Sequence, residues 1–461
     1  MTKTRTVQDS MGNMSLPIDA LYGAQTQRAV ENFPISGQGM PKAFILALAE
    51  VKLACAKANN ELGLLTDEQT QAIETAVQHI LSTKPMDAFP VDVFQTGSGT
   101  STNMNMNEVI ATLAHNLAAV NIHPNDHVNM SQSSNDVIPS AIHVSAHQLL
   151  EHQLKPSLEH LIATISNKEI EVTGVVKTGR THLMDAMPIT LSQELSGWRH
   201  QLLDNLERLN QTQTRLTKLA VGGTAVGTGI NAPSGFAASF CQHLSSIHQT
   251  HYQPMDSFFV GLSSQDTALE LSGQLNVLAA SLMKIANDLR WMNSGPLAGL
   301  GEIQLPALQP GSSIMPGKVN PVIPEAVAMV CAQVTGHHTA ISIGAQSGNF
   351  QLNVMLPMIA FNLLNSITWL SQAMQQLADK AIQGFKVNLT QLERALAVNP
   401  ILVTALNNVV GYEKGAEIAK KAYQTGQPVL DVAEALTNLD RETLYKLLDP
   451  ARLTEGGTPG L

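Results

Sequence analysis

The sequence predicts a mainly α-helical protein organised around a central bundle of long helices. Three observations support this fold class: segments with helical periodicity fill the middle of the chain, strand-like material is sparse, and short helices follow near the end. A helix of about 30 residues extends about 45 Å, so such rods must bury their apolar stripes against one another. The long periodic segments are 135–166, 188–219, 264–293, 320–344 and 353–382.

Prolines mark expected boundaries and irregularities in these helices. Pro188 suits the first turn of the second long helix, where its missing N–H would lack a partner in any case. Pro156, Pro324 and Pro357 fall inside predicted helices, and each removes one backbone hydrogen bond. We therefore expect kinks or interruptions at these three positions.

Strand-like material is limited to Glu171–Lys177 and to the glycine-rich stretch GGTAVGTG over Gly222–Gly229, so no large sheet is expected. After Val387 the pattern changes to short helices, which predicts a small helical domain at the C-terminal end. The breaks between these short helices lie at Pro400, Gly411, Gly426 and Pro428.

Composition narrows the class of protein. The chain has 461 residues, of which 44% are apolar and only 14% are charged. The charged fraction is well below the roughly 25% that is usual, and interface cores are depleted in charge, so we expect a homo-oligomer. The net charge of -10 and the absence of a long Lys/Arg run leave no attraction for a phosphate backbone, which argues against nucleic acid as a partner.

Neither a secretory signal nor a membrane span is expected. Residues 1–17 lack an apolar stretch, and the apolar run around Lys52 carries charges and is shorter than the ~20 residues that a span needs. The cysteines are odd in number and scattered, which fits reduced core residues better than disulfides or a metal site. They are Cys55, Cys241 and Cys331. A cytoplasmic protein is expected.

Four polar, glycine-punctuated segments interrupt the apolar helical background, and each is expected to precede a helix. Small hydroxyl and amide side chains beside the free N–H groups of a helix N-terminus form a cradle for a carboxylate. The same residue types also cap ordinary helices, so one segment alone does not separate binding from capping. The segments are TGSGTSTNMN (Thr96–Asn105), HPNDHVNMSQSSND (His123–Asp136), GRTHLMDA (Gly179–Ala186) and GSSIMPGKVNPVIPEA (Gly311–Ala326).

These segments do not fit nucleotide or metal sites. The GSSIMPGK stretch has five residues between its glycines where a P-loop has four, and Val319 stands where Ser or Thr would hold magnesium. The TGSGTSTN stretch lacks the preceding strand of a dinucleotide site. His123 and His127 are four apart, but Pro124 argues against the regular helix that would align them as metal ligands. No metal is expected.

Together the four segments resemble the motifs of the fumarase/aspartase superfamily in the order and spacing of that family. GSSIMPGKVNP, which starts at Gly311, looks like its signature loop, and GYEKGAEIAKKA, which starts at Gly411, is similar to its last domain. The resemblance covers essentially the whole chain and implies a three-domain fold: an N-terminal lyase domain over 1–133, a central long-helix bundle over 134–389 and a small C-terminal helical domain over 390–461. It also implies a small dicarboxylate substrate, no cofactor, no membrane partner, and a homotetramer whose active sites are shared by three subunits.

Three positions make the chain similar to class II fumarases. His182 replaces the Gln of aspartases, while His123 and Gly317 stand where aspartases usually show Asn and Ala. Ser131 and the NPVIPEA stretch after Lys318 depart from the commonest fumarase pattern and are similar to a bacterial branch. The resemblance implies reversible, stereospecific hydration of fumarate to (S)-malate, the fumarate hydratase reaction of the tricarboxylic acid cycle. The alternatives are an aspartate ammonia-lyase and a catalytically silent structural protein on the same scaffold.

The resemblance also implies roles for single residues. Ser312 would remove the carbon-bound proton through an aci-carboxylate carbanion that Lys318 stabilises, although by itself Ser312 could equally be a turn residue. His182, oriented by Glu325, would handle the water, although without the family it could equally be a hydrogen-bonded core histidine. The substrate-binding residues would be Ser98, Gly99, Thr100, Ser133, Ser134, Asn135, Thr181, Ser313, Val319 and Asn320, and a second dicarboxylate site would comprise His123, Pro124, Asn125 and Asp126.

Overall fold

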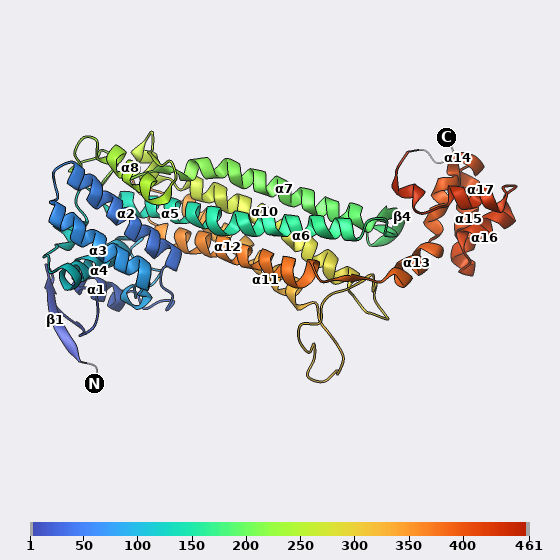
Figure 1. Ribbon diagram of the computed structural model, residues 1–461, viewed down its shortest axis with the longest axis horizontal. Coiled ribbons are helices and arrows are strands. Elements are labelled where there is room, and N and C mark those ends of the chain that lie inside the picture. The colour runs from blue at the N-terminus through green and yellow to red at the C-terminus, as the bar shows by residue number, and fades with distance from the viewer. Residues whose placement is uncertain (1–2, 458–461) are drawn as a thin grey trace. The chain divides into compact units, whose positions relative to one another are not determined.

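The computed structural model describes residues 3–457 and divides into two compact units (Figure 1). Each unit is built from segments that are far apart in the sequence. Unit 1 comprises Met1–Pro156, Asn205–Ala279 and Val330–Ser371, and unit 2 comprises Ser157–Asp204, Ala280–Met329 and Gln372–Leu461. The domain boundaries predicted after residues 133 and 389 stay a prediction.

Unit 1 is a helical assembly with α2 (Lys42–Glu61) at its centre. This helix packs against α3 (Asp67–Thr83), α5 (Ser134–Leu149) and α8 (Phe236–His248), and α3 also packs against α4 (Thr100–Ala118). The buried side chains of α2 lie on several faces, as expected for a helix with three neighbours. The other elements are β1 (Thr4–Asp9), β2 (Gly12–Pro17), α1 (Ala24–Asn32), β5 (Lys218–Leu219), β6 (Gln253–Pro254) and α9 (Phe258–Ser263), with a 3₁₀ turn over Met86–Ala88 and π-helical turns over Pro124–Val128 and Leu150–Leu154.

Unit 2 contains a β-hairpin, a long loop and a cluster of short helices. Strands β3 (Val176–Thr181) and β4 (Met184–Thr190) pair antiparallel, with an irregularity between Thr178 and Arg180. The short helices enclose an apolar core that includes Leu406. The other elements are β7 (Ile303–Gln304), β8 (Lys386–Val387), α13 (Leu389–Ala397), α14 (Asn407–Val410), α15 (Tyr412–Thr425), α16 (Val429–Leu436) and α17 (Arg441–Leu447), with 3₁₀ turns over Pro400–Leu406 and Arg452–Thr454 and a π-helical turn over Ala378–Ile382.

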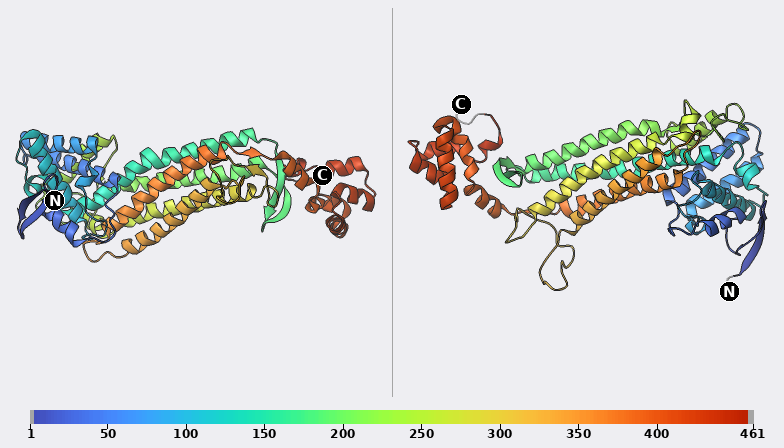
Figure 2. Two further views of the ribbon diagram at one scale, coloured as in Figure 1. Left: turned by 90° about the horizontal axis from the view of Figure 1, so that it is seen from below. Right: turned by 180° about the vertical axis from the view of Figure 1, so that it is seen from behind.

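Five long helices contribute segments to both units, and within each unit these segments run side by side (Figures 1 and 2). On α10, Leu271, Leu275 and Leu278 are buried at a spacing that puts them on one face. The predicted mainly α fold with a bundle of long helices is confirmed. The five helices are α6 (Lys155–Glu171), α7 (Leu191–Leu216), α10 (Asp266–Met292), α11 (Val322–Ala345) and α12 (Leu356–Leu377).

The second long helix begins later than predicted. The expectation that Pro188 lies in its first turn is wrong, because Pro188 pairs with Thr178 in the hairpin. Strand β4 has a single partner strand, so a residue without an N–H is tolerated there. The true start carries a capping box, in which the Gln193 N–H donates to Thr190 Oγ1 at 3.1 Å and the Thr190 N–H donates to Gln193 Oε1 at 2.9 Å.

The three prolines expected inside helices all lie near helix starts. Pro156 is the second residue of α6 and follows the π-helical turn Leu150–Leu154, an irregularity of the kind that accommodates a missing hydrogen bond. Pro324 and Pro357 occupy the first turns of α11 and α12, where an N–H needs no helical partner. The expected interruptions at Pro324 and Pro357 are therefore wrong, because these helices begin later than the periodicity suggested.

The prediction that strands are few is correct, but the predicted positions of the strands are partly wrong. Glu171 ends α6, and β3 begins only at Val176. The stretch Gly222–Gly229 forms turns rather than a strand. The described residues contain only two-stranded sheets, which confirms that the fold has no large sheet.

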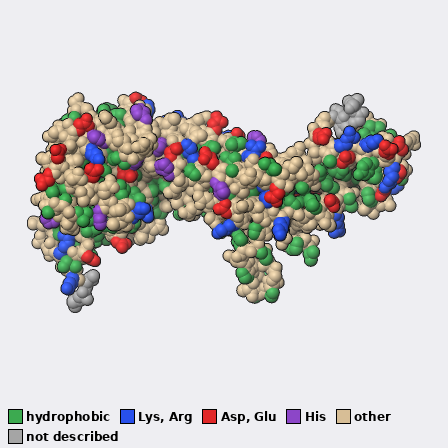
Figure 3. Space-filling model, viewed as in Figure 1, with side chains coloured by type: hydrophobic (Ala, Val, Ile, Leu, Met, Phe, Trp, Pro, Cys, Tyr) green, Lys and Arg blue, Asp and Glu red, His purple; other side chains and the backbone are tan. Residues whose placement is uncertain are grey.

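Three further features concern the hydropathy of the helices, the surface charges and the cysteines. None of the helices in residues 3–457 combines the length and apolarity that crossing a bilayer requires. On the face drawn in Figure 3, basic side chains lie scattered among acidic ones. Cys55, Cys241 and Cys331 are buried and unpaired, as predicted. Burial raises the pKa of the Cys241 and Cys331 thiols to about 12, so both stay protonated and unreactive.

A buried histidine should make the fold sensitive to acid. Burial lowers the pKa of His143 from 6.5 to about 4, and the ring shares a 2.9 Å hydrogen bond with Lys218 O. Since the unfolded chain binds this proton more tightly, stability is highest above pH 6.5 and falls as the pH drops towards 4, by up to about 3 kcal/mol for this group. A His143→Asn variant keeps a donor for that carbonyl but does not titrate. Its urea midpoint should therefore decline less between these pH values than that of the unmodified protein, and equal declines would contradict this.

Candidate functional site

The four polar segments are distributed two in each unit. Thr96–Asn105 and His123–Asp136 belong to unit 1, whereas Gly179–Ala186 and Gly311–Ala326 belong to unit 2. Three of them lead into helices as predicted, namely α4, α5 and α11. The expectation is wrong for Gly179–Ala186, which spans the end of β3 and the start of β4 and forms the tip of the hairpin.

In unit 1, two helix N-termini meet at a cluster of hydroxyl groups. Ser98 Oγ lies 2.8 Å from Thr100 Oγ1, which lies 2.7 Å from Ser134 Oγ. Thr100 is the first residue of α4, and the preceding Gly99 provides no side-chain cap. Ser134 is the first residue of α5. Hydroxyl donors and helix N-termini aimed at one place form a binding site suited to a carboxylate.

Two glycines allow this convergence. Gly99 has φ +73°, and a Cβ there would lie 2.9 Å from the Ile138 side chain of α5. At Gly97 a Cβ would lie 1.8 Å from Val354 O, a backbone atom that has no freedom to withdraw. A side chain at either position would push the N-terminus of α4 away from its neighbours and separate the hydroxyl groups.

At the start of α5, Ser133 caps the helix, and the next two residues contact other parts of unit 1. Ser133 is a helix cap, because its Oγ accepts from the Asn135 N–H at 3.2 Å while Asp136 Oδ1 accepts from the Ser133 N–H at 3.0 Å. The Asn135 side chain donates to Ala225 O at 2.8 Å. The capping interpretation therefore holds for Ser133, whereas Ser134 faces the hydroxyl cluster.

In unit 2, His182 lies at the tip of the β3–β4 hairpin. His182 and Leu183 form its two-residue turn with φ values of 58° and 61°, the left-handed conformation that such a turn requires. Neither is a glycine, and strained backbone of this kind clusters at functional sites. Thr181 and His182 are both exposed, so the alternative of a core histidine is wrong.

A buried group of charges holds the base of this hairpin. Lys177 Nζ lies 2.6 Å from Glu194 Oε2 and 2.8 Å from Glu302 Oε2, and Glu302 Oε1 lies 2.7 Å from Arg180 Nη2. Lys177 and Glu302 are buried. The sequence analysis missed this group because its members come from three separate stretches with no local pattern. The pairs fix β3 immediately before Thr181 and His182.

The signature loop in unit 2 is closed at its neck. The Gly311 N–H donates to Lys318 O at 2.8 Å, and Asn320 Nδ2 donates to Gly311 O at 2.7 Å. A Cβ at Gly311 would lie 2.2 Å from Lys318 O, so the neck requires glycine. Ser313 and Val319 are exposed on the closed loop.

Inside this loop Ser312 has a distinct environment. Its Oγ accepts from the backbone N–H groups of Ile314 at 3.2 Å and Met315 at 3.1 Å. Ser312 thus shapes a turn, and the same two donors favour the ionised form of its hydroxyl, because hydrogen bonds to a charged form stabilise it. Lys318 Nζ donates to Asn320 Oδ1 at 2.5 Å, which places a cation in the same loop.

A single chain does not join all the candidate catalytic groups. Glu325 lies in the first turn of α11, and His182 lies on the hairpin. Within residues 3–457 no hydrogen bond or ion pair links His182 to Glu325 or to Ser312. The contacts within unit 2 therefore hold each group in its own segment.

The proposed second dicarboxylate site lies beside a hollow in unit 1. His123 precedes the π-helical turn Pro124–Val128, and its Nδ1 accepts from the Asp126 N–H at 3.1 Å. The segment forms a single π-helical turn and not a regular α-helix, as expected. His123, Pro124 and Asn125 line a hollow of about 820 Å³, together with Arg5 and His115. In residues 3–457, no three His, Cys, Asp or Glu side chains are grouped as metal ligands would be.

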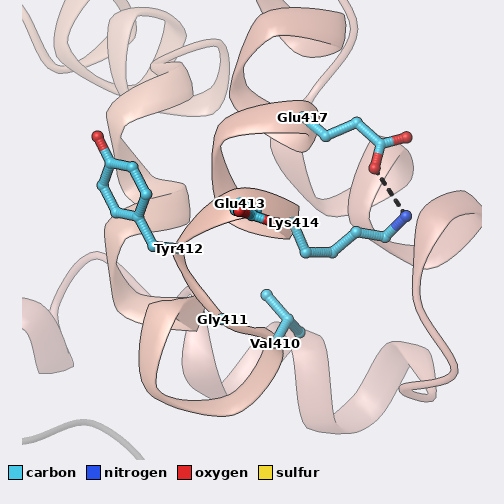
Figure 4. Close-up of a pocket in the computed structure, with 6 residues that line it drawn as sticks. All are labelled: Val410, Gly411, Tyr412, Glu413, Lys414 and Glu417. Atoms are coloured by element: carbon cyan, nitrogen blue, oxygen red, sulfur yellow. Dashed lines mark hydrogen bonds and ion pairs between the residues drawn. The ribbon is translucent and has the colours of Figure 1, made fainter.

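Another hollow, in the short helices of unit 2, is lined by none of the predicted catalytic or substrate-binding residues (Figure 4). Its volume is about 500 Å³, and Lys414 and Glu417 on its wall form an ion pair of 2.8 Å. The Tyr412 ring points away from this pair (Figure 4). The hollow is lined by Val410, Gly411, Tyr412, Glu413, Lys414 and Glu417.

Comparisons with known proteins agree with this arrangement. Residues 12–336 match the Lyase family, and residues 402–455 match the family described as Fumarase C C-terminus. The chain is 58% identical to Fumarate hydratase class II 2 of Pseudomonas aeruginosa, over 99% of this chain and 100% of that protein. It is 57% identical to Fumarate hydratase class II of Xylella fastidiosa, over 98% of this chain and 96% of that protein.

A solved structure shows the same fold. The recombinant class II fumarase of Schistosoma mansoni superposes with a TM-score of 0.95 at 36% identity, covering 98% of this chain and 99% of that one. The match spans both units and the C-terminal helices, so it is not confined to one motif. From the family matches, the full-length relatives and the shared fold together, the chain belongs to the class II fumarase family.

Proposed function

We propose that this protein catalyses the reversible, stereospecific hydration of fumarate to (S)-malate in the tricarboxylic acid cycle. The observation that carries the proposal is the 58% identity to a fumarate hydratase over 99% of this chain and 100% of the relative. The substrate is therefore a small dicarboxylate. Identity at this level over the full length of both chains supports the same chemistry.

The hard step of this reaction is removal of a carbon-bound proton next to a carboxylate. When malate is dehydrated, the C3–H bond breaks and its electron pair moves into the adjacent carboxylate as an aci-carboxylate. That extra charge must be met by donors that are already in place. Lys318, with Asn320 beside it, supplies a cation and an amide for this purpose, and their mutual hydrogen bond supports a joint role.

Ser312 is the proposed base. As an alkoxide it takes the C3 proton and becomes a neutral hydroxyl. The two N–H groups that point at its Oγ support this role, because they stabilise negative charge on that atom. The nearby Lys318 adds positive charge within the same loop.

His182 is the proposed acid on the other face of the substrate. As the C2–O bond breaks, the imidazolium gives its proton to the departing hydroxide, which leaves as water. In the hydration direction the neutral imidazole removes a proton from the attacking water. Its exposed position at the hairpin tip, on strained backbone held by the Glu302 ion pairs, supports this role. Glu325 is the proposed orienting carboxylate for the ring.

The substrate carboxylates are proposed to bind at the hydroxyl cluster and the adjoining amides. Hydroxyl donors and two helix N-termini suit the negative charge of a dianion. The proposed contacts comprise the groups already located in unit 1, together with Thr181 and the loop residues of unit 2. They are Ser98, Gly99, Thr100, Ser133, Ser134, Asn135, Thr181, Ser313, Val319 and Asn320.

We propose a homotetramer in which three subunits contribute to each active site. A shared site explains why, within residues 3–457 of one chain, no hydrogen bond or ion pair joins His182 to Glu325 or to Ser312. The low charged fraction of 14% supports large interfaces between subunits. Exposed apolar side chains on the long helices support them as well, and they include Leu203, Trp291, Met329 and Ile343.

Two further assignments accompany this function. His123, Pro124, Asn125 and Asp126 form the proposed second dicarboxylate site, and the hollow beside the first three supports it. A cytoplasmic location is proposed, which the three unpaired, buried cysteines support because they suit a reducing compartment.

Ultraviolet absorbance of fumarate tests the proposed reaction directly. With fumarate and a metal chelator present, the absorbance should fall until malate and fumarate reach equilibrium, and addition of malate should reverse the change. The same assay with ammonium separates an aspartate ammonia-lyase, which would consume fumarate only when ammonium is present. A protein inactive under both conditions would contradict both of these lyase activities.

A further inference from the structure

A lysine is buried at the centre of unit 1. Lys52, in the middle of α2, is 0% exposed, and its chain neighbours Val51 and Leu53 are buried as well. Removing an ammonium group from water is costly unless it gains strong partners, and an apolar residue of similar length often serves stability equally well. A lysine here therefore points to a role beyond packing.

The ammonium group binds one turn of the chain. Lys52 Nζ donates to Asn129 Oδ1 at 3.0 Å and to Gln132 Oε1 at 2.9 Å. Asn129 Oδ1 also accepts from Asn103 Nδ2 at 3.0 Å and from Asn107 Nδ2 at 3.1 Å, both on α4. Three donors from two helices thus converge on a single amide oxygen of this turn.

The turn needs this support because its backbone is strained. Ser131 has φ +63°, a left-handed conformation that is unfavourable for a residue with a Cβ. Gln132 Nε2 donates back to Val128 O at 3.0 Å and to Met130 O at 2.9 Å, so the side chain that Lys52 holds closes the turn. Farther along α2, Asn59 donates to Met130 O at 3.0 Å and accepts from Ser131 Oγ at 2.8 Å. Helix α2 therefore anchors Val128–Gln132 at two points.

The anchored turn leads directly into the N-terminus of α5. Gln132 is followed by the cap Ser133 and by Ser134, whose hydroxyl lies 2.7 Å from Thr100 Oγ1. Asp136 fixes the next turn of the helix, because its Oδ2 accepts from the N–H groups of Gly222 at 3.1 Å and Thr224 at 2.8 Å. A shift of the turn would thus move Ser133, Ser134 and Asn135 together.

We propose that Lys52 is a positioning residue for substrate binding: by holding Val128–Gln132 it orients Ser133, Ser134 and Asn135 toward a substrate carboxylate. The inference rests on the proposed function, in which these three residues bind the dianion. Lys52 touches neither the substrate nor the reacting atoms.

The electrostatics of the site agree with this role. No carboxylate in residues 3–457 forms an ion pair with Lys52. Burial lowers the pKa of Lys52 to about 8, and the nearby Cys55 and Asp136 oppose that shift. The ammonium group stays largely charged at neutral pH. A positive charge therefore lies behind the turn that leads into α5, whose N-terminus is proposed to bind a dianion.

Kinetics of two methionine variants test the proposal. Lys52→Met removes the donor and the charge while keeping the length of the side chain. Lys168→Met is the matched control: Lys168 is also buried, but it binds Glu171 and Phe385 O, and neither residue is among the proposed substrate contacts. For Lys52→Met we expect the KM of fumarate and malate to rise at least about tenfold, since small misplacements of binding groups have large kinetic effects. The control should change KM less than about twofold.

A Lys52→Gln variant keeps a neutral donor and should fall between the unmodified protein and Lys52→Met in KM. This order supports positioning even if Lys52→Met yields little folded protein. The positioning role would be overturned if KM were unchanged in both folded Lys52 variants. It would also be overturned if kcat fell only in proportion to the loss of folded protein. Hydrogen exchange gives a readout that does not need turnover: the peptide around Val128–Asp136 should exchange faster in Lys52→Gln. If the unmodified protein did not hydrate fumarate, the proposed function would fail, and unchanged exchange would separately overturn the positioning role.

Discussion

A Ser312→Ala variant should fold and assemble normally and lose about 100- to 10,000-fold in kcat, the range that general acid or base groups contribute. The substitution removes the only atom proposed to accept the C3 proton. It also leaves the Ile314 and Met315 N–H groups without their acceptor, but these lie on an exposed loop where water replaces it. Ultraviolet measurement of fumarate formation from malate gives kcat, and circular dichroism confirms the fold.

Ser82→Ala is a suitable control for this variant. The Ser82 hydroxyl is exposed and donates to Gln78 O within its own helix, α3. The Ser82→Ala variant should keep a kcat within about twofold of that of the unmodified protein, because most surface substitutions have small effects. Full turnover by Ser312→Ala would rule out Ser312 as the base and would leave its role as that of a turn residue.

A His182→Asn variant should also lose about 100- to 10,000-fold in kcat, because no group would remain to protonate the departing hydroxide. The hairpin should survive, since asparagine adopts positive φ more readily than most residues and is favoured in two-residue hairpin turns. The loss would thus report the missing imidazole rather than a collapsed turn.

The neighbouring turn residue provides the control for His182. Leu183→Asn places the same side chain at the other position of positive φ, where Leu183 is exposed. Its turnover should stay within about tenfold of the unmodified protein, because the imidazole remains. Equal losses in the two variants would show that the hairpin shape matters and that the His182 ring has no separate role.

Periodicity in the sequence was sufficient to predict the fold class. A long amphipathic helix is stabilised by packing against other helices, and α7, α10, α11 and α12 follow their predicted segments closely. The first predicted segment, 135–166, is divided into α5 and α6 by the π-helical turn Leu150–Leu154. Boundaries were less certain because local signals compete. Pro188 suits a helix start, but the capping box of Thr190 and Gln193 lies two to five residues beyond it, and the pairing of Thr178 with Pro188 keeps Pro188 in the hairpin.

The sequence predicts only part of the candidate site. The resemblance predicts four segments as parts of the site, and three of them precede helices as expected. It did not reveal that His182 sits on a hairpin tip, because two residues of positive φ without glycine have no clear sequence signal. In the sequence, Lys52 is only a charge that interrupts an apolar run, because its partners Asn129 and Gln132 lie far along the chain. Contacts of this kind depend on the folded topology.

The central claim is that residues of different subunits complete each active site. Mixing Ser312→Ala and His182→Asn proteins, each nearly inactive, tests it after subunit exchange has been verified by native mass spectrometry. If Ser312 and His182 of one site come from different chains, random hybrid tetramers at equal input should regain about a quarter of the activity of the unmodified protein, since one site in four receives both intact residues. If activity stays at the level of the separate variants although hybrids have formed, both residues serve the same site within one chain and the account is wrong.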